Sequence, residues 1–86
     1  MEIKFDTAKD ETNRTKHGVS LILGRIVLEN RVADLIDPRN ATEERRIAFG
    51  TIEGRLFACA YTMRGPVYRI ISVRKANRRE QRRWLS

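Results

Sequence analysis

Four short apolar segments separated by turn signals limit the fold more than any other feature of this 86-residue sequence. The segments are rich in β-branched and aromatic residues, which favour strands. Gly, Pro, Asn and Asp lie between them, and the connections are too short for parallel neighbours. The sequence therefore predicts an antiparallel meander. The expected strands are residues 31–36, 45–49, 56–62 and 68–74, with Gly50 ending the second.

Three helices are predicted around these strands, each beginning at a residue that commonly caps a helix N-terminus. The capping residues are Asp6, Ser20 and Asn77. Gly18 is placed to end the first helix after residues 7–16, and Glu80 completes a capping box with Asn77. The expected fold is α+β, with two N-terminal helices, a four-stranded antiparallel sheet and a C-terminal helix. We expect the helices to cover one face of the sheet in a single domain spanning residues 1–86.

The excess positive charge is concentrated in the C-terminal part of the chain. The formal net charge is +7, yet residues 1–50 hold nine basic and nine acidic residues. Residues 51–86 hold nine basic residues and two acidic ones. Charge localised in this way fits a polyanionic partner, either a nucleic acid or an acidic protein. The predicted last helix carries arginines four apart, whose repulsion a phosphate would relieve. They are Arg78, Arg79, Arg82 and Arg83.

Several classes of site are disfavoured by the sequence. Cys59 is the only cysteine and lies in an apolar segment, which excludes an internal disulfide and a cysteine-based zinc site. The carboxylates are scattered, and there is no phosphate-binding glycine loop or nucleophile elbow. We therefore expect no metal and no cofactor. No apolar segment has membrane-spanning length and the first residues do not resemble a secretory signal, so we expect no membrane partner and a cytoplasmic protein.

His17 and Lys16 are candidate catalytic residues at the end of the first predicted helix. His17 is the only histidine, and imidazole is the side chain that exchanges a proton most readily near neutral pH. It could act as a general base or acid at a phosphodiester. The alternative for both residues is a structural role at a helix C-terminus, where cations are favoured.

Period-two alternation sorts the side chains of the last predicted strand. Tyr68, Ile70, Ser72 and Arg74 share one face, and Arg69, Ile71, Val73 and Lys75 share the other. The second set contains the apolar residues Ile71 and Val73 and is expected to face the core. Arg74 is therefore expected on the open face, where it can stabilise the charge of a phosphate. The alternatives for Arg74 are a solvated charge at the edge of the sheet and an ion pair with Glu43 or Glu44 of a neighbouring strand. Arg64 and Tyr61 are expected near the same face, with Tyr61 either stacking on a base or lying in the core.

Motifs along nearly the whole chain occur in the order of a known family. They are Phe5-Asp6 followed by Lys9 and Asn13, then Lys16-His17-Gly18-Val19-Ser20, Glu43-Glu44-Arg45, Gly50, Tyr61-Thr62 followed by Arg64, Arg69-Ile70-Ile71-Ser72-Val73-Arg74-Lys75-Ala76 and Arg78-Arg79-Glu80. With these motifs the sequence resembles the BrnT toxins of bacterial type II toxin–antitoxin pairs, which share the RelE-like ribonuclease fold. The resemblance implies an endoribonuclease that inhibits translation. It also implies a BrnA-like antitoxin partner and a complex that binds operator DNA through the antitoxin.

The resulting hypothesis is metal-independent RNA cleavage, in which the 2′-hydroxyl of the RNA is the nucleophile and a 2′,3′-cyclic phosphate is the expected product. The predicted catalytic residues are His17, Arg74, Arg64 and Lys16. The predicted RNA-binding residues are Arg69, Lys75, Arg78, Arg79, Arg82, Arg83 and Tyr61. Two alternatives stay open from the residues alone: a non-catalytic nucleic-acid-binding module, and a subunit whose basic face binds an acidic protein.

Overall fold

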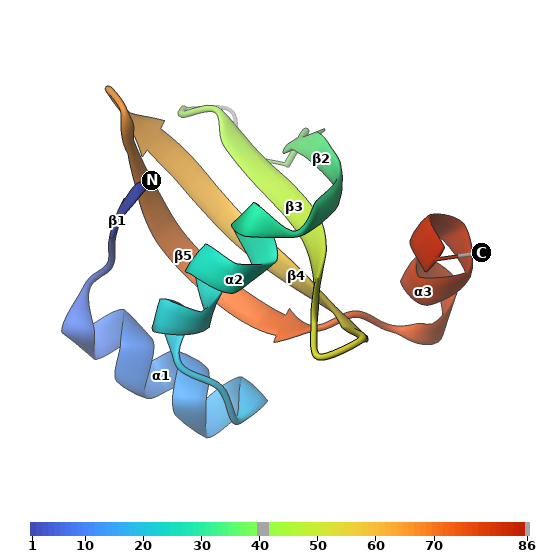
Figure 1. The fold of residues 1–86 in the computed structure, drawn as a ribbon. Helices are drawn as coiled ribbons and strands as arrows, with labels where there is room; N and C mark the ends of the chain where they lie inside the picture. Colours follow the sequence, from blue (N-terminus) through green and yellow to red (C-terminus); the bar gives the residue numbers. More distant parts are fainter. Residues whose placement is uncertain (40–41, 86) are drawn as a thin grey trace.

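The computed structural model describes residues 1–39 and 42–85 and arranges them around one mixed sheet. The elements are β1 (Glu2–Lys4), α1 (Thr7–His17), the 3₁₀ turn η1 (Leu21–Leu23), α2 (Gly24–Glu29), β2 (Arg31–Asp37), β3 (Arg45–Ile52), β4 (Arg55–Arg64), β5 (Val67–Lys75) and α3 (Arg78–Leu85). The strands lie in the order β1-β5-β4-β3-β2 (Figure 1). Within the described residues, no helix has the length and apolar character needed to cross a membrane.

The sheet contains a strand that the sequence did not indicate. β1 runs parallel to β5, with Glu2 opposite Val67 and Lys4 opposite Arg69. β2 to β5 form the antiparallel meander that was predicted. The prediction of a four-stranded antiparallel sheet is therefore wrong, because the sheet has five strands and is mixed. Three residues are too few to show a strand period, and the partner strand lies near the other end of the chain.

The N-terminal helical region follows its capping residues, and the helix predicted after Ser20 consists of two short elements. Asp6 caps α1 by accepting the backbone N–H groups of Ala8 and Lys9 at 2.8 and 3.1 Å, and Gly18 ends the helix with a φ of 75°. Ser20 caps the next turn as predicted. That turn is a three-residue 3₁₀ segment, and it leads into a six-residue α2.

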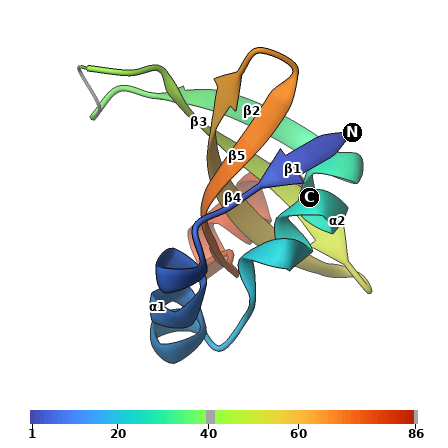
Figure 2. The same cartoon turned by 90° about the vertical axis from the view of Figure 1, so that its left-hand side faces the viewer.

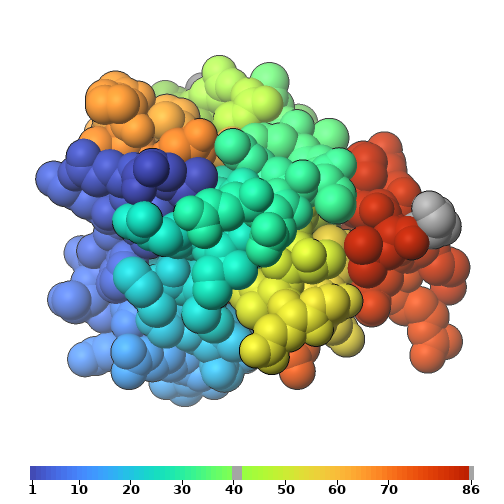
Figure 3. All heavy atoms as spheres, in the orientation of Figure 1, coloured from blue at the N-terminus to red at the C-terminus, as the bar shows by residue number. Residues whose placement is uncertain are grey.

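Helices pack on both faces of the sheet, so the prediction that they cover one face is wrong. Successive residues of β4 alternate between two clusters of buried side chains. Phe57 and Cys59 pack with η1 and α2, whereas Leu56 and Ala58 pack with Trp84 of α3. α1 lies beside β5, at the edge of the sheet (Figures 1 and 2). α3 projects as a separate lobe at the side of the molecule (Figure 3).

β5 contains a bulge at Ile71 that changes which residues share a face. The partners of Ile70 and Ser72 on β4 are adjacent residues, so Ile71 is the extra residue in the ladder. One extra residue inverts the alternation on one side of it. Ile70 is therefore buried in the same cluster as Val73. The predicted placement of Ile70 on the open face and Arg69 on the core face is wrong.

Gly50 lies inside β3, and the prediction that it ends a strand is wrong. A Cβ atom at this position would lie 2.1 Å from the carbonyl oxygen of Val27 in α2. The glycine therefore allows the backbone of α2 to pack directly against the strand.

Candidate functional site

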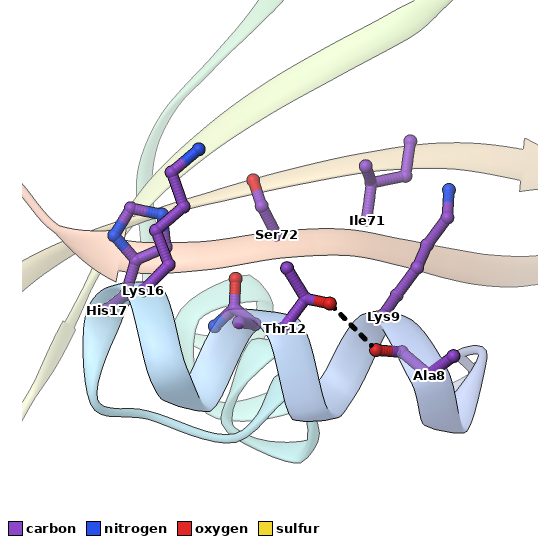
Figure 4. Close-up of a pocket in the computed structure, with 8 residues that line it drawn as sticks. Ala8, Lys9, Thr12, Lys16, His17, Ile71 and Ser72 are labelled. Atoms are coloured by element: carbon purple, nitrogen blue, oxygen red, sulfur yellow. Dashed lines mark hydrogen bonds between the residues drawn. The ribbon is translucent and has the colours of Figure 1, made fainter.

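A groove between α1 and β5 contains two of the four predicted catalytic residues. Its volume is 340 Å³. The residues that line it are Ala8, Lys9, Thr12, Asn13, Lys16, His17, Ile71 and Ser72. Figure 4 shows Lys16 and His17 at one end of the groove and Lys9 at the other, with Ser72 between them on β5. The described lining residues include no acidic side chain, so the groove favours an anion.

A buried amide holds α1 against the strand at this groove. The side chain of Asn13 is 4% exposed. Its Nδ2 donates to the carbonyl oxygens of Val19 and Val73, both at 2.9 Å, and its Oδ1 accepts the N–H of Val73 at 3.2 Å. β1 ends at Lys4, and beyond that point Asn13 supplies the backbone partners that β5 would otherwise lack. The groove-lining side of α1 is therefore fixed next to Ser72.

A buried carboxylate fixes the chain that follows α1. Asp10 Oδ1 accepts hydrogen bonds from the backbone N–H of Leu21 at 2.6 Å and from Ser20 Oγ at 2.9 Å. Its Oδ2 lies 3.2 Å from Arg14 Nη2. The hydrogen bond from Leu21 is the main reason that the pKa of Asp10 lies below its ordinary value. The loop that contains Gly18 is thus tied to the helix, which fixes the position of His17.

His17 and Lys16 differ in their surroundings. The His17 side chain is half-buried in the last turn of α1, whereas Lys16 is exposed. Both line the groove together with the hydroxyl-bearing Ser72. The groove therefore brings an imidazole, ammonium groups and a hydroxyl around a space that can hold a phosphate.

The bulge in β5 gathers basic residues on the face that carries Ser72. Arg69, Ser72 and Arg74 lie opposite Thr62, Ala60 and Ala58 of β4. Those three β4 residues alternate regularly and share one face. Arg74 thus lies on the same face as Ser72, as predicted. Arg69 joins them because of the bulge.

Arg74 is held by an ion pair with Glu80 of α3. Its Nη1 and Nη2 contact the two carboxylate oxygens at 2.8 and 2.9 Å. This hydrogen bonding lowers the pKa of Glu80 and raises that of Arg74. Glu80 also forms the predicted capping box with Asn77, with both bonds at 2.8 Å. An ion pair of Arg74 was one of the alternatives in the sequence, but Glu43 and Glu44 pair instead with Arg64 and Arg46.

The remaining predicted residues lie outside the groove. Arg64, at the end of β4, lines a different pocket together with Arg69. Trp84 anchors α3 by stacking on Phe49, with ring centroids 5.9 Å apart. The other basic residues predicted to bind RNA are all exposed. They are Lys75, Arg78, Arg79, Arg82 and Arg83.

Tyr61 is part of the core on the opposite face. Its side chain is 2% exposed, and its hydroxyl donates to Asp34 Oδ2 at 2.5 Å. Burial, together with that carboxylate, raises the pKa of Tyr61 to about 12. Its ring packs against Tyr68 with centroids 5.3 Å apart. The structure therefore does not bring this ring to the groove or to an exposed surface for stacking.

Lys9 belongs to the family motif, but neither Lys9 nor Thr12 was selected from the sequence as a candidate site residue. Their spacing from Lys16 places all three on one side of a helix, and this signal could have identified them. Among residues 1–39 and 42–85, no group of three or more His, Cys, Asp or Glu side chains is arranged to hold a metal ion. Burial raises the pKa of the Cys59 thiol to about 12, which makes it a poor nucleophile.

The sequence that forms this groove matches a known protein family. The sequence fits the family described as "Ribonuclease toxin, BrnT, of type II toxin-antitoxin system" over residues 5–80. The chain belongs to the BrnT family. A search of curated proteins finds no matching sequence. The predicted resemblance to BrnT toxins is confirmed, and the family assigns this chain a ribonuclease activity, an RNA target and an antitoxin partner. The matched segment includes α1 and β5, which form the groove, and Glu80, which pairs with Arg74.

Proposed function

We propose that this BrnT protein is an endoribonuclease that cuts RNA in the groove between α1 and β5. The observation that carries the proposal is that His17, Lys16, Lys9 and Ser72 line one groove (Figure 4). The scissile phosphate binds between the two lysines. In the cell this cleavage inhibits translation.

Cleavage uses the 2′-hydroxyl of the RNA as its nucleophile. The neutral imidazole of His17 accepts the 2′-hydroxyl proton, the 2′-oxygen bonds to phosphorus, and the bond from phosphorus to the 5′-oxygen breaks. The 5′-oxygen takes up a proton from water, and the protonated imidazole of His17 returns its proton to the solvent. The other product is a 2′,3′-cyclic phosphate, which water hydrolyses to a 3′-phosphate. Lys9 and Lys16 stabilise the negative charge on the phosphate oxygens as it grows. No divalent metal takes part in these steps.

Arg74, two residues after Ser72 on β5, supports the reaction. A guanidinium has five N–H donors, so the contacts of Arg74 with Glu80 leave donors for a phosphate oxygen. The pair also fixes the direction of the side chain on the face that carries Ser72. Arg74 therefore acts on the phosphate with its orientation already set.

The remaining basic residues bind the RNA strand on either side of the groove. Lys75 and the arginines of α3 continue from the Arg74 end of β5, and Arg69 and Arg64 lie toward its other end. This assignment accounts for the excess positive charge of residues 51–86.

A BrnA-like antitoxin neutralises the toxin by covering this cationic surface, and the complex binds operator DNA through the antitoxin. Expression of the chain alone is expected to arrest growth and degrade RNA. Co-expression with the adjacent antitoxin gene is expected to restore growth and to leave the RNA intact. Normal growth with intact RNA during expression of the folded protein would contradict the proposal.

The direct test is incubation of the purified protein with RNA in excess EDTA, followed by analysis of the new RNA ends. We expect cleavage to persist and to leave 2′,3′-cyclic phosphate or 3′-phosphate ends. RNA in which the 2′-hydroxyl is replaced by a 2′-O-methyl group should bind without being cut. Loss of activity in EDTA, or products with 3′-hydroxyl ends, would overturn the mechanism.

A further inference from the structure

The pairing of β1 with β5 builds a second cationic pocket. This pocket has a volume of 310 Å³ and is lined by Lys4, Arg64, Val67 and Arg69. Lys4 lies directly opposite Arg69, and Arg64 lies opposite Val67. Basic side chains from three strands therefore surround one space. Lys4 lies outside the segment that matches the BrnT family, and only the parallel pairing of β1 brings it to β5.

Two of these three cations lack a partner in the described part of the chain. Arg64 Nη2 contacts Glu43 Oε2 at 2.9 Å, and this pair is exposed. Lys4 and Arg69 form no side-chain hydrogen bond or ion pair with any of residues 1–39 and 42–85. Like charges directly opposite on neighbouring strands destabilise a sheet. An anion bound between Lys4 and Arg69 would offset this repulsion, and a phosphate group offers the oxygen acceptors that both side chains need.

The pocket lies on the same face of the sheet as the groove residue Ser72. The bulge at Ile71 places Arg69 and Ser72 on one face. Their partners on β4, Thr62 and Ala60, are two residues apart, and a strand rises about 3.3 Å per residue, so Arg69 and Ser72 are separated by about 7 Å along the sheet. The arginines of α3 follow the other end of the strand. An RNA strand that lies along β5 would therefore meet the pocket on one side of Ser72 and α3 on the other.

We propose that Lys4, Arg64 and Arg69 form a binding site for a backbone phosphate of the RNA, on the side of the cleavage groove away from α3. The proposal rests on the function proposed above and adds to it a defined flanking site. The proposal predicts that additional nucleotides on this side of the groove raise the affinity for RNA only when the phosphate bound by the pocket is charged.

The first test compares RNA oligonucleotides that extend to different lengths on either side of the scissile phosphate. One contains only the nucleotides on each side of the scissile phosphate, and two others add three nucleotides on the 5′ or the 3′ side. Lys4→Gln should lower kcat/KM about tenfold for one of the two extended RNAs and leave the other two unchanged. The matched control is Arg25→Gln, which removes one exposed charge from α2 on the opposite face of the sheet and should leave all three rates unchanged.

A second measurement does not depend on cleavage. Binding of 2′-O-methyl RNA is measured by fluorescence anisotropy, with single phosphates replaced in turn by uncharged methylphosphonates. Replacement of one particular phosphate should weaken RNA binding by the unmodified protein. The same replacement should not weaken RNA binding by Lys4→Gln any further, since the replacement and the substitution remove the same interaction. The slope of binding against salt should also fall by about 0.7 in the variant. Thermal unfolding of both variants confirms that they are folded.

The possible outcomes separate this proposal from the proposed function. Equal loss on all three RNAs, no loss on any, or additive effects of Lys4→Gln and every methylphosphonate would overturn the phosphate site. Weaker antitoxin binding with unchanged RNA binding would also overturn it, because the pocket would then be a protein interface. If the unmodified protein binds RNA but cuts none, the proposed function fails, while the anisotropy measurement still decides whether the phosphate site exists.

Discussion

The two helices that carry basic residues of the proposed site are attached to the sheet in different ways. α1 has a buried amide and a buried carboxylate, Asn13 and Asp10, which bond to the backbone of β5 and of the following loop. α3 has no buried residue and is held by the Arg74–Glu80 ion pair and by the stacking of Trp84 on a ring of β3. α1 is thus a fixed part of the fold, and α3 is an appended one.

This difference matches the two tasks that the proposed function requires. Proton transfer and stabilisation of charge at phosphorus need groups that are held in place, and small displacements there cost rate. Attraction of a polyanion acts over about 8–10 Å in physiological salt and tolerates movement of the cations. We infer that the chemistry depends on α1 and β5, whereas α3 contributes affinity.

The largest expected effect comes from removing the anchor of α1. Asn13→Ala leaves a buried N–H and two carbonyl groups without partners, and we expect the free energy of unfolding to fall by about 3 kcal/mol. Denaturant unfolding followed by circular dichroism measures this change. The matched control is Asn30→Ala, which removes a single exposed hydrogen bond to Thr51 and should cost about 1 kcal/mol or less. Equal losses for both variants would show that the buried amide does not anchor the helix.

The next effect is on rate alone. His17→Ala should reduce single-turnover cleavage about a hundredfold, because general acid–base catalysis typically contributes that much or more. The affinity for 2′-O-methyl RNA should change less than threefold. Normal cleavage by the folded variant would mean that His17 is only a helix-terminal residue, and that another group, such as a lysine of the groove, transfers the proton.

Arg74 and Glu80 separate catalysis from the attachment of α3. Both Arg74→Ala and Glu80→Gln break the ion pair, but only the first removes the guanidinium from the face that carries Ser72. We expect Arg74→Ala to lower cleavage of bound RNA about tenfold and Glu80→Gln to lower it less than threefold. Hydrogen exchange of α3 should accelerate in both variants. Equal rate losses would show that Arg74 serves only to hold α3.

The same ion pair predicts the effect of acid on α3. The folded pKa of Glu80 lies below its ordinary value of 4.5, so its contribution to stability is present above that pH. It is lost as the pH falls further and the carboxyl becomes protonated. After correction for the intrinsic pH dependence of amide exchange, the protection of the α3 amides should therefore fall below about pH 4.5 in the unmodified protein, while Glu80→Gln should show no such step.

The sequence predicted the parts of the fold that depend on local signals. The caps at Asp6 and Ser20, the antiparallel meander and the capping box of Asn77 with Glu80 are all present. It did not predict β1, because a three-residue parallel strand has no local signature. It also missed the bulge at Ile71, since alternation assumes a regular ladder.

The residues of the candidate site also differ in whether local signals or only tertiary packing identify them. Lys16 and His17 could be selected by residue type, but their neighbour Ser72 joins them only through the packing of α1 against β5. The partner of Arg74 was missed because Glu80 was assigned to its capping role, and it fills both roles at once. Lys4 could not be selected at all, since its pairing opposite Arg69 requires β1.

The smallest expected effect concerns the exposed arginines of α3. It tests whether α3 contributes affinity for RNA without contributing to the cleavage rate. If α3 supplies affinity, the double variant Arg78→Ala/Arg79→Ala should bind 2′-O-methyl RNA more weakly and with a salt slope reduced by about 0.7 for each phosphate that α3 no longer neutralises. At saturating protein, the single-turnover rate should stay within about twofold of the unmodified value, because neither side chain lines the groove. Arg25→Ala serves as the control for removal of a charge that lies outside the α3 surface. An unchanged salt slope would place the RNA footprint elsewhere. A large fall in the saturated rate would mean that α3 positions the scissile phosphate, and the separation of a fixed catalytic groove from an appended binding helix would then be wrong.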